Sequence, residues 1–143
     1  MKRVCDLLHG KGRAVWFLTP DATVYEAIDQ MAEKGVGALL VMEREQLVGI
    51  VSERDYARKV ILKGKSSRET RVDEIMSQPV ICVSPDLTVD QTMALMTEKH
   101  VRHLPVVVGD TVVGVISIGD VVRGIIDDKE FYIQQLTTYI TAS

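Results

Sequence analysis

The sequence has few of the residues that build disulfide frameworks and no apolar run long enough to span a membrane. Its 143 residues include two cysteines, Cys5 and Cys82, whose separation does not match metal-ligand spacing. So few thiols indicate a reducing compartment, and we expect both to be buried as small apolar side chains. No run approaches the roughly 18 apolar residues of a membrane helix, and the N-terminus lacks a signal-like apolar segment. These absences favour a cytoplasmic protein that does not enter a membrane.

Neither sign of charge dominates, and no catalytic motif is present. The chain has 17 Lys and Arg against 20 Asp and Glu, with basic residues scattered except at 11–13 and 63–71. This pattern excludes the basic stripe of a nucleic-acid-binding surface. No Walker loop, GxGxxG segment or nucleophile elbow occurs. His100 and His103 straddle an expected helix end and strand, so they do not form a metal pair. We therefore expect neither an enzyme nor a metal site.

The chain contains an internal repeat. Residues 19–55 placed over 84–120, at an offset of 65 without gaps, are identical at 14 of 37 positions. Upstream, RVCDLL (3–8) matches RVDEIM (71–76), and KGR (11–13) is an insertion in the first repeat alone. A chain of this length fits one compact domain or two very small units that need one another. We divide it into a first repeat, a linker, a second repeat and a C-terminal helical extension, at 1–64, 65–71, 72–127 and 128–143.

Each repeat predicts the same order of elements, of the α/β (α+β) class. A short buried strand, 15–18 or 80–83, precedes an amphipathic helix that begins with a capping box at Thr23 or Thr88. Two apolar strands follow, and Gly109-Asp110 between the second pair is typical of a hairpin turn. A closing helix begins at Ser52 or Ser117 and runs to residue 64 or 126. A further helix is expected to begin within residues 3–8, and another within residues 71–76.

The last strand of each repeat ends in a related motif, GIVSERD (49–55) or GVISIGD (114–120). Ser-x-x-Asp at a helix start is a capping arrangement in its own right. The same Asp is also suited to accepting two hydrogen bonds from the cis hydroxyls of a ribose, beside helix N–H groups that can meet phosphate. Gly49 and Gly114 would leave room for such a ligand. Both interpretations stay open from the residues alone.

The tandem β-α-β-β-α order resembles the CBS-domain family, and the pair resembles a Bateman module. The resemblance covers residues 3–127 and is carried by TPDATVYEA, KGVGALLV and GIVSERD, and by SPDLTVDQT, KHVRHLPVV and GVISIGD. The whole chain is similar to small stand-alone bacterial CBS pairs assigned to signal transduction. The resemblance implies two repeats packed through their sheets with pseudo-two-fold symmetry, and two clefts between them that bind adenine nucleotides.

The resemblance also implies which residues form these clefts. Asp55 and Asp120 would bind the ribose, with Ser52 and Ser117 on the phosphate side. Each cleft would take its Asp from one repeat and much of its adenine wall from the other. The Asp120 cleft would be completed by Ala22, Ala27, Val36, Gly37 and Ala38, with Val115 beside the base. The Asp55 cleft would be completed by Leu87, Thr92, Val101, Arg102 and His103, with Ile50 beside the base.

The two implied clefts differ in charge. Arg102 and His103, with Arg54 next to Asp55, would give the Asp55 cleft a preference for more highly charged phosphates. Alternatively, Arg102 pairs with Glu98 on the surface. The insertion places Lys11 and Arg13 in an expected glycine-flanked loop, where they either reach a second phosphate or remain solvated. The first repeat departs from the family pattern at Leu40, where the second repeat has Pro105.

The sequence therefore predicts a sensor or regulatory module that reversibly binds AMP, with ATP, ADP, NAD and NADH as alternatives. We expect a homodimer that acts on a separate regulated protein. A structural dimerisation or adaptor module without a nucleotide is the alternative. The C-terminal segment 130–140 predicts a helix with an apolar stripe, which either makes the dimer contact or packs back on its own subunit. The stripe consists of Phe131, Ile133, Leu136 and Ile140.

Overall fold

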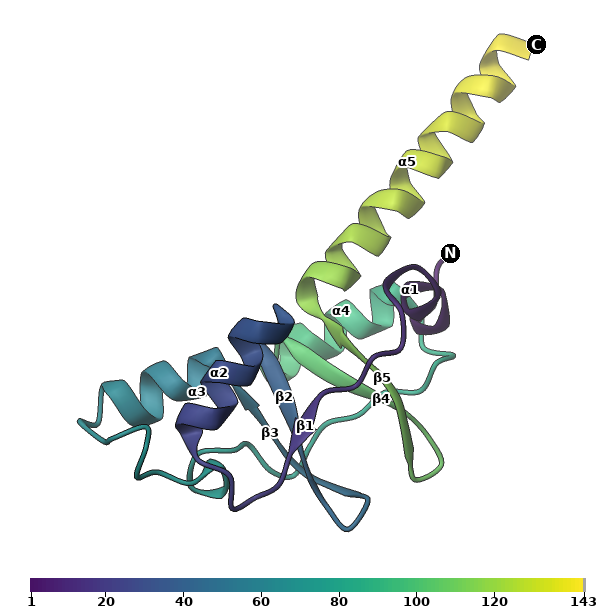
Figure 1. Ribbon diagram of the computed structural model, residues 1–143. Helices are drawn as coiled ribbons and strands as arrows, with labels where there is room; N and C mark the ends of the chain where they lie inside the picture. Colours follow the sequence, from purple (N-terminus) through teal and green to yellow (C-terminus); the bar gives the residue numbers. More distant parts are fainter. Residues whose placement is uncertain (143) are drawn as a thin grey trace. The chain divides into compact units, whose positions relative to one another are not determined.

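A computed structural model describes residues 1–142, and the chain forms two units (Figure 1). Unit 1 joins Met1–Ala14 to the chain from Cys82 onward, and unit 2 is Val15–Ile81. Each unit combines helices with a small sheet, which confirms the predicted mixed class. None of the helices in residues 1–142 has both the length and the apolar character that crossing a bilayer requires.

Unit 2 contains a three-stranded sheet in the order β1-β2-β3. Its elements are β1 (Phe17–Leu18), α2 (Val24–Lys34), β2 (Ala38–Glu43), β3 (Gln46–Ser52) and α3 (Glu53–Tyr56). Strand β1 runs parallel to β2, and β2 and β3 form an antiparallel hairpin. The expected closing helix is α-helical only to Tyr56, because Ala57–Ile61 forms a π-helical turn.

Unit 1 contains the matching hairpin of β4 and β5. Its elements are α1 (Val4–Lys11), α4 (Val89–Lys99), β4 (His103–Val108), β5 (Thr111–Ser117) and α5 (Ile118–Ala142). The predicted turn at 109–110 is confirmed, and Gly109 has a φ of 61°. The expected strand at 80–83 is reduced to one parallel bridge between Val83 and Val106. Cys5 and Cys82 are half-buried rather than fully buried.

Helices α2 and α4 begin and end where the sequence indicates. The Oγ1 atom of Thr23 accepts a hydrogen bond from the Glu26 N–H at 3.1 Å, and Thr88 does the same for Gln91 at 3.1 Å. Both helices end at a residue in the left-handed conformation, Gly35 in unit 2 and the equivalent His100 in unit 1. The predicted capping boxes are therefore confirmed.

The two units do not coincide with the two contiguous sequence repeats. Helix α1 opens the first repeat but belongs to unit 1, and the segment 71–76 opens the second repeat but belongs to unit 2. In the latter segment the expected helix is a short 3₁₀ turn, Val72–Glu74. The Val4 N–H donates to the Leu87 carbonyl at 2.8 Å, and the Val72 N–H donates to the Ala22 carbonyl at 2.8 Å. Each opening segment thus completes the unit that holds the other repeat's hairpin.

Gly49 and Gly114 provide room for these opening segments. A Cβ on Gly114 would lie 2.6 Å from Cδ2 of Leu8, whose side chain is buried. In unit 2, Met76 lies against Gly49 in the same way. Since a side chain and not a solvent-filled space faces each glycine, close packing explains both glycines. The interpretation of these positions as room for a ligand is corrected.

Helix α5 is continuous from Ile118 to Ala142, so the expected closing helix and C-terminal extension form one element. Val121 is buried, and the Lys2 backbone N–H bonds Oδ2 of Asp128 at 2.9 Å. From Lys129 onward every described side chain is exposed, and this part of α5 extends away from the rest of unit 1 (Figure 1). The predicted apolar stripe therefore does not pack back on unit 1.

Candidate functional site

The two Ser-x-x-Asp motifs have the same geometry in the two units. Oδ2 of Asp55 accepts from the Ser52 N–H at 2.9 Å and from the Ser52 hydroxyl at 3.1 Å. Oδ2 of Asp120 accepts from the Ser117 N–H at 2.8 Å and from its hydroxyl at 3.1 Å. Each Asp backbone N–H also donates to the Ser hydroxyl oxygen, so both motifs cap their helices. The cap uses one carboxylate oxygen and leaves the other for a different partner.

A lysine lies on each carboxylate, but the two lysines come from different elements. Lys59 Nζ is 3.1 Å from Oδ1 of Asp55 and donates to the Ile75 carbonyl at 2.8 Å. Lys11 Nζ is 2.6 Å from Oδ2 of Asp120. Within the described residues no hydrogen bond reaches Oδ1 of Asp120. That oxygen can accept from a ligand without losing an existing protein contact.

The sequence predicts Lys11 in a loop, but the structure places it in a helix. It is the last residue of α1, and only Arg13 follows the helix in an exposed segment, after Gly12. The helix end fixes Lys11 beside Asp120, whose own helix begins at Ile118. A groove of about 200 Å³ contains both side chains, and its lining also includes Lys2, Gly10, Arg123 and Asp127.

The resemblance assigns Arg102 and His103 to the Asp55 cleft, but in the structure both lie in unit 1 beside Lys11 and Asp120. His103 pairs with Ser117 across the hairpin, and the Ile118 N–H donates to the Arg102 carbonyl at 2.8 Å. The Arg102 side chain is exposed and, among the described residues, makes no ion pair with Glu98. Unit 1 therefore gathers three basic or titratable side chains around one carboxylate.

The pKa values in this cluster are shifted. Burial lowers the pKa of His103, and the charges of Lys11 and Arg102 lower it further, against the opposite effect of Asp120. Burial acts to raise the pKa of Asp120, but the Lys11 and Ser117 hydrogen bonds outweigh it and the pKa is lowered. His103 is consequently neutral and Asp120 ionised at neutral pH.

Unit 2 has the matching backbone arrangement, with Gly37 and Ala38 at the positions that Arg102 and His103 hold in unit 1. The Glu53 N–H donates to the Gly37 carbonyl at 3.0 Å, and Ala38 pairs with Ser52. Arg54 is half-buried next to Asp55. Sequence reasoning missed Lys59, although its spacing of four residues from Asp55 on a helix predicts an ion pair.

The predicted adenine-wall residues differ in accessibility. Ala27 and Thr92 are fully buried, and the Thr92 hydroxyl donates to the Thr88 carbonyl at 2.7 Å, so neither offers surface to a ligand. Ala38 is also buried. The remaining wall residues are half-buried: Ala22, Val36, Gly37, Ile50, Leu87, Val101 and Val115. No cluster of three or more His, Cys, Asp or Glu side chains suited to a metal occurs in the part of the chain described here.

The low pKa of His103 leads to a pH prediction. Because the pKa in the folded state lies below the usual 6.5, its contribution to stability is complete above pH 6.5 and is lost as the pH falls through the folded-state pKa. Lys11→Met is expected to raise the pKa of His103, since it removes a neighbouring positive charge. An NMR titration of the imidazole C–H signals measures this pKa. Lys2→Met is the matched control and should leave it unchanged; an unchanged pKa in Lys11→Met would contradict the arrangement.

Two units with the same hairpin, the same capped helices and the same Ser-Asp geometry define a duplicated α+β module. The chain belongs to the CBS-domain family, whose model matches residues 12–62 and 72–127. Tandem pairs of this family are regulatory modules, and the predicted resemblance is confirmed.

Three comparisons support the assignment. The chain is 40% identical over 146 residues to the CBS domain-containing protein CBSX3, mitochondrial, of Arabidopsis thaliana, covering 96% of this chain and 71% of that protein. A solved protein with CBS domains from Burkholderia ambifaria is 49% identical, with a TM-score of 0.85, covering 89% of this chain and 96% of that chain. The CBS-domain pair of protein MJ0100, solved with 5′-methylthioadenosine and S-adenosyl-L-methionine, is 25% identical, with a TM-score of 0.76, covering 86% and 94%.

Proposed function

We propose that this chain is a regulatory module that reversibly binds an adenosine-containing ligand, with AMP as the first candidate and ATP, ADP, NAD and NADH as alternatives. The observation that carries the proposal is the repeated Ser-Asp pair, whose capping bonds occupy one carboxylate oxygen. Oδ1 of Asp120 would accept from a ribose hydroxyl. At Asp55 the ribose would compete with Lys59 for Oδ1.

The neighbouring cations suit a ligand with phosphate groups. Lys11 contacts Asp120, and the Arg102 carbonyl accepts from the Ile118 N–H, so both cations lie near the start of α5, where they could approach a bound phosphate. A phosphate would stabilise the protonated form of His103, so binding should draw a proton into the site at mildly acidic pH.

The relative solved with two adenosine compounds supports this ligand class. Those compounds lack a 5′-phosphate, so the basic cluster of unit 1 is the reason to rank AMP ahead of them here. We further propose that the chain is a cytoplasmic homodimer, is not an enzyme, and changes its contact with a regulated protein when a ligand binds. Such a change requires different affinities of the two conformations for the ligand.

A structural adaptor without a nucleotide is the second candidate, because both Asp side chains already act in helix caps. A thermal-shift panel separates the two candidates. Wild-type protein is heated with AMP, ADP, ATP, NAD, NADH or S-adenosylmethionine, with CMP as the control for phosphate without adenine. A ligand at about 100 times its Kd adds roughly 2.7 kcal/mol, which raises the midpoint by several degrees.

A higher unfolding midpoint with adenosine compounds, but not with CMP, supports the sensor function. An unchanged midpoint with every compound supports the adaptor function instead. Chromatography of each mixture after incubation tests the expectation that the protein is not an enzyme: recovered nucleotide should be unaltered, and a new product would contradict it.

A further inference from the structure

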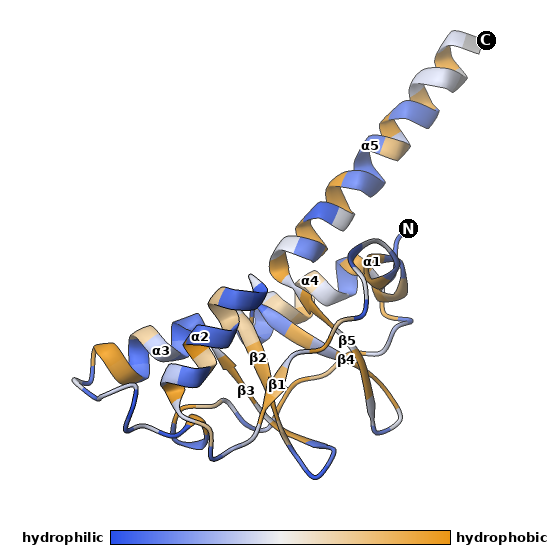
Figure 2. Cartoon of the chain, viewed as in Figure 1, coloured by the Kyte–Doolittle hydropathy of each residue, from blue (hydrophilic) through white to orange (hydrophobic). Residues whose placement is uncertain are grey.

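Helix α5 carries a second regular pattern that the nucleotide site does not use. Its exposed positions repeat at alternating steps of four and three residues: Val122, Ile126, Lys129, Ile133, Leu136 and Ile140. We refer to these six positions as the α5 seam. The five apolar members are 40% to 69% exposed. Figure 2 shows apolar segments recurring along the whole length of α5. A period of 3.5 residues is the signature of a helix that pairs with another helix.

The C-terminal half of α5 has little support from its own unit. Beyond Lys129 every described side chain is exposed, so unit 1 buries none of them. A helix of roughly 12–15 residues without tertiary contacts is marginal in water. Thr137, Thr138, Ile140 and Thr141 are β-branched and have low helix propensity. Covering the α5 seam would supply the stability that this sequence lacks.

We propose that the α5 seam pairs with the same seam of a second copy of this chain, as a parallel two-stranded coiled coil in register. The positions divide into one set of three isoleucines, Ile126, Ile133 and Ile140, and an alternating set of Val122, Lys129 and Leu136. The steps of three and four residues put the isoleucines at heptad position a and the alternating set at position d. Isoleucine at a with leucine at d, as in Ile133 and Leu136, favours two parallel strands. The seam is self-complementary, as a two-fold symmetric contact requires.

Lys129 decides the direction and the register. In a parallel pair in register, both copies of Lys129 share one layer, so only one of the six layers is polar. Glu130 follows at the flanking position, where it can neutralise the lysine of the other copy. An antiparallel pair centred on the extension would instead place each ammonium opposite an apolar side chain, which desolvates the charge without a partner.

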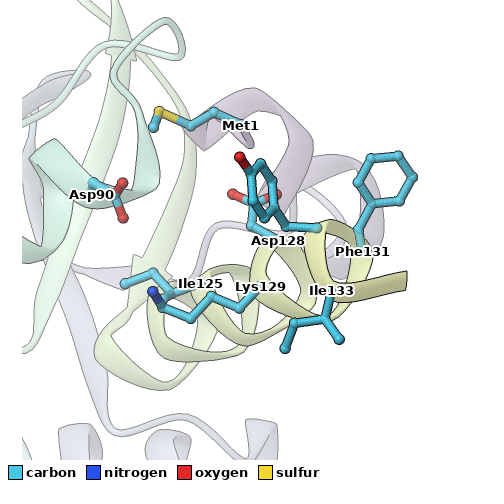
Figure 3. Close-up of a pocket in the computed structure, with 8 residues that line it drawn as sticks. Met1, Asp90, Ile125, Asp128, Lys129, Phe131 and Ile133 are labelled. Atoms are coloured by element: carbon cyan, nitrogen blue, oxygen red, sulfur yellow. The ribbon is translucent and has the colours of Figure 1, made fainter. Parts of the chain in front are cut away.

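The surroundings of Lys129 suit this arrangement. Figure 3 shows Ile125, Lys129 and Ile133 along one face of α5, with Phe131 directed away from them. They border a hollow of about 600 Å³ whose lining also includes Tyr132 and Met1. The aliphatic stem of Lys129 lies on an apolar face, and its ammonium can reach the edge.

The test measures self-association of the full chain by sedimentation velocity over a range of concentrations. Leu136→Asp should raise the dimer dissociation constant by about 100-fold or more, because two charges enter one apolar layer. Thr138→Asp adds the same charge on the opposite face of the helix and is the matched control, which should leave the dimer intact. Lys129→Ile should tighten the dimer by removing the polar layer.

A monomer in the wild-type chain, or a dimer unaffected by Leu136→Asp, would overturn the proposal. The parallel orientation of the two α5 helices is tested separately, in a Cys5→Ser, Cys82→Ser background. Leu136→Cys should form an intermolecular disulfide under mild oxidation, because both copies of position 136 share a layer, whereas Thr138→Cys should not. Failure of Leu136→Cys to cross-link overturns the parallel arrangement. The proposal is independent of the nucleotide, since a chain that binds no adenosine compound can still pair through α5.

Discussion

Asp120→Asn is expected to weaken binding of the adenosine ligand about 100-fold, measured by isothermal titration calorimetry. The substitution keeps the shape and one acceptor oxygen, so the Ser117 cap can persist, but it removes the charge that strengthens bonds from ribose hydroxyls. Hydrogen bonds to a charged group contribute roughly 1.5–3 kcal/mol each, and about 2.7 kcal/mol is a factor of 100. Asp55→Asn tests the other repeat. We expect the larger loss at Asp120, because its Oδ1 atom has no competing lysine.

Asp110→Asn is the matched control for the same charge change. Asp110 lies in the exposed turn between β4 and β5, so this variant should bind as the wild type does. If Asp55→Asn and Asp120→Asn both bind with unchanged affinity, the two carboxylates act only as helix caps. If only one variant loses affinity, the affected repeat identifies the occupied site.

Gly114→Val is expected to lower the free energy of unfolding by about 3 kcal/mol, measured by urea denaturation. The new Cβ would lie 2.6 Å from Cδ2 of Leu8, well inside van der Waals contact. Because Leu8 is buried in unit 1, it can move only by disturbing its neighbours, and overpacking of this kind costs roughly 1–3 kcal/mol or more. Valine otherwise suits a strand, so the loss reports the contact with α1.

A double-mutant cycle identifies the cause. Leu8→Ala alone should cost about 2–5 kcal/mol, and the combination with Gly114→Val should cost clearly less than the sum, because the valine fills space that the leucine leaves. Gly10→Ala in α1 is the control, since its Cβ would meet no atom within 4 Å and alanine favours a helix. Simple additivity in the cycle would show that Leu8 is not the obstacle.

The sequence predicts the local elements of this fold better than their partners. Thr23 and Thr88 mark helix starts because a cap depends only on residues three positions away. The RVCDLL segment also predicts the helix at the start of the first repeat. It does not say which repeat this helix packs on, because both repeats present equivalent strands with a glycine at the same place. The exchange of opening segments therefore appears only in the structure.

The residues of the candidate site can likewise be predicted only where they depend on local spacing. The Ser52–Asp55 and Ser117–Asp120 pairs follow from spacing within one turn, and Lys59 could have been found from its spacing to Asp55. Lys11 and Asp120 are separated by 109 residues, and no local rule joins them. The repeat alignment identifies KGR as an insertion, but the role of Lys11 depends on where α1 ends. Because α1 extends to Lys11, this lysine contacts the Asp120 carboxylate and does not lie in a loop.

Unit 1 is built from two chain segments that lie on either side of unit 2 in the sequence, and this sets an order for folding during synthesis. Unit 2 is one uninterrupted stretch, so it can form as soon as residue 81 has left the ribosome. Helix α1 precedes unit 2 in the chain but packs later, because Val4 and Leu8 gain their cover only after β5 and α5 have been translated. Until then the nascent chain exposes the apolar face of α1. Helix α1 is thus translated before unit 2 and completes its packing after it.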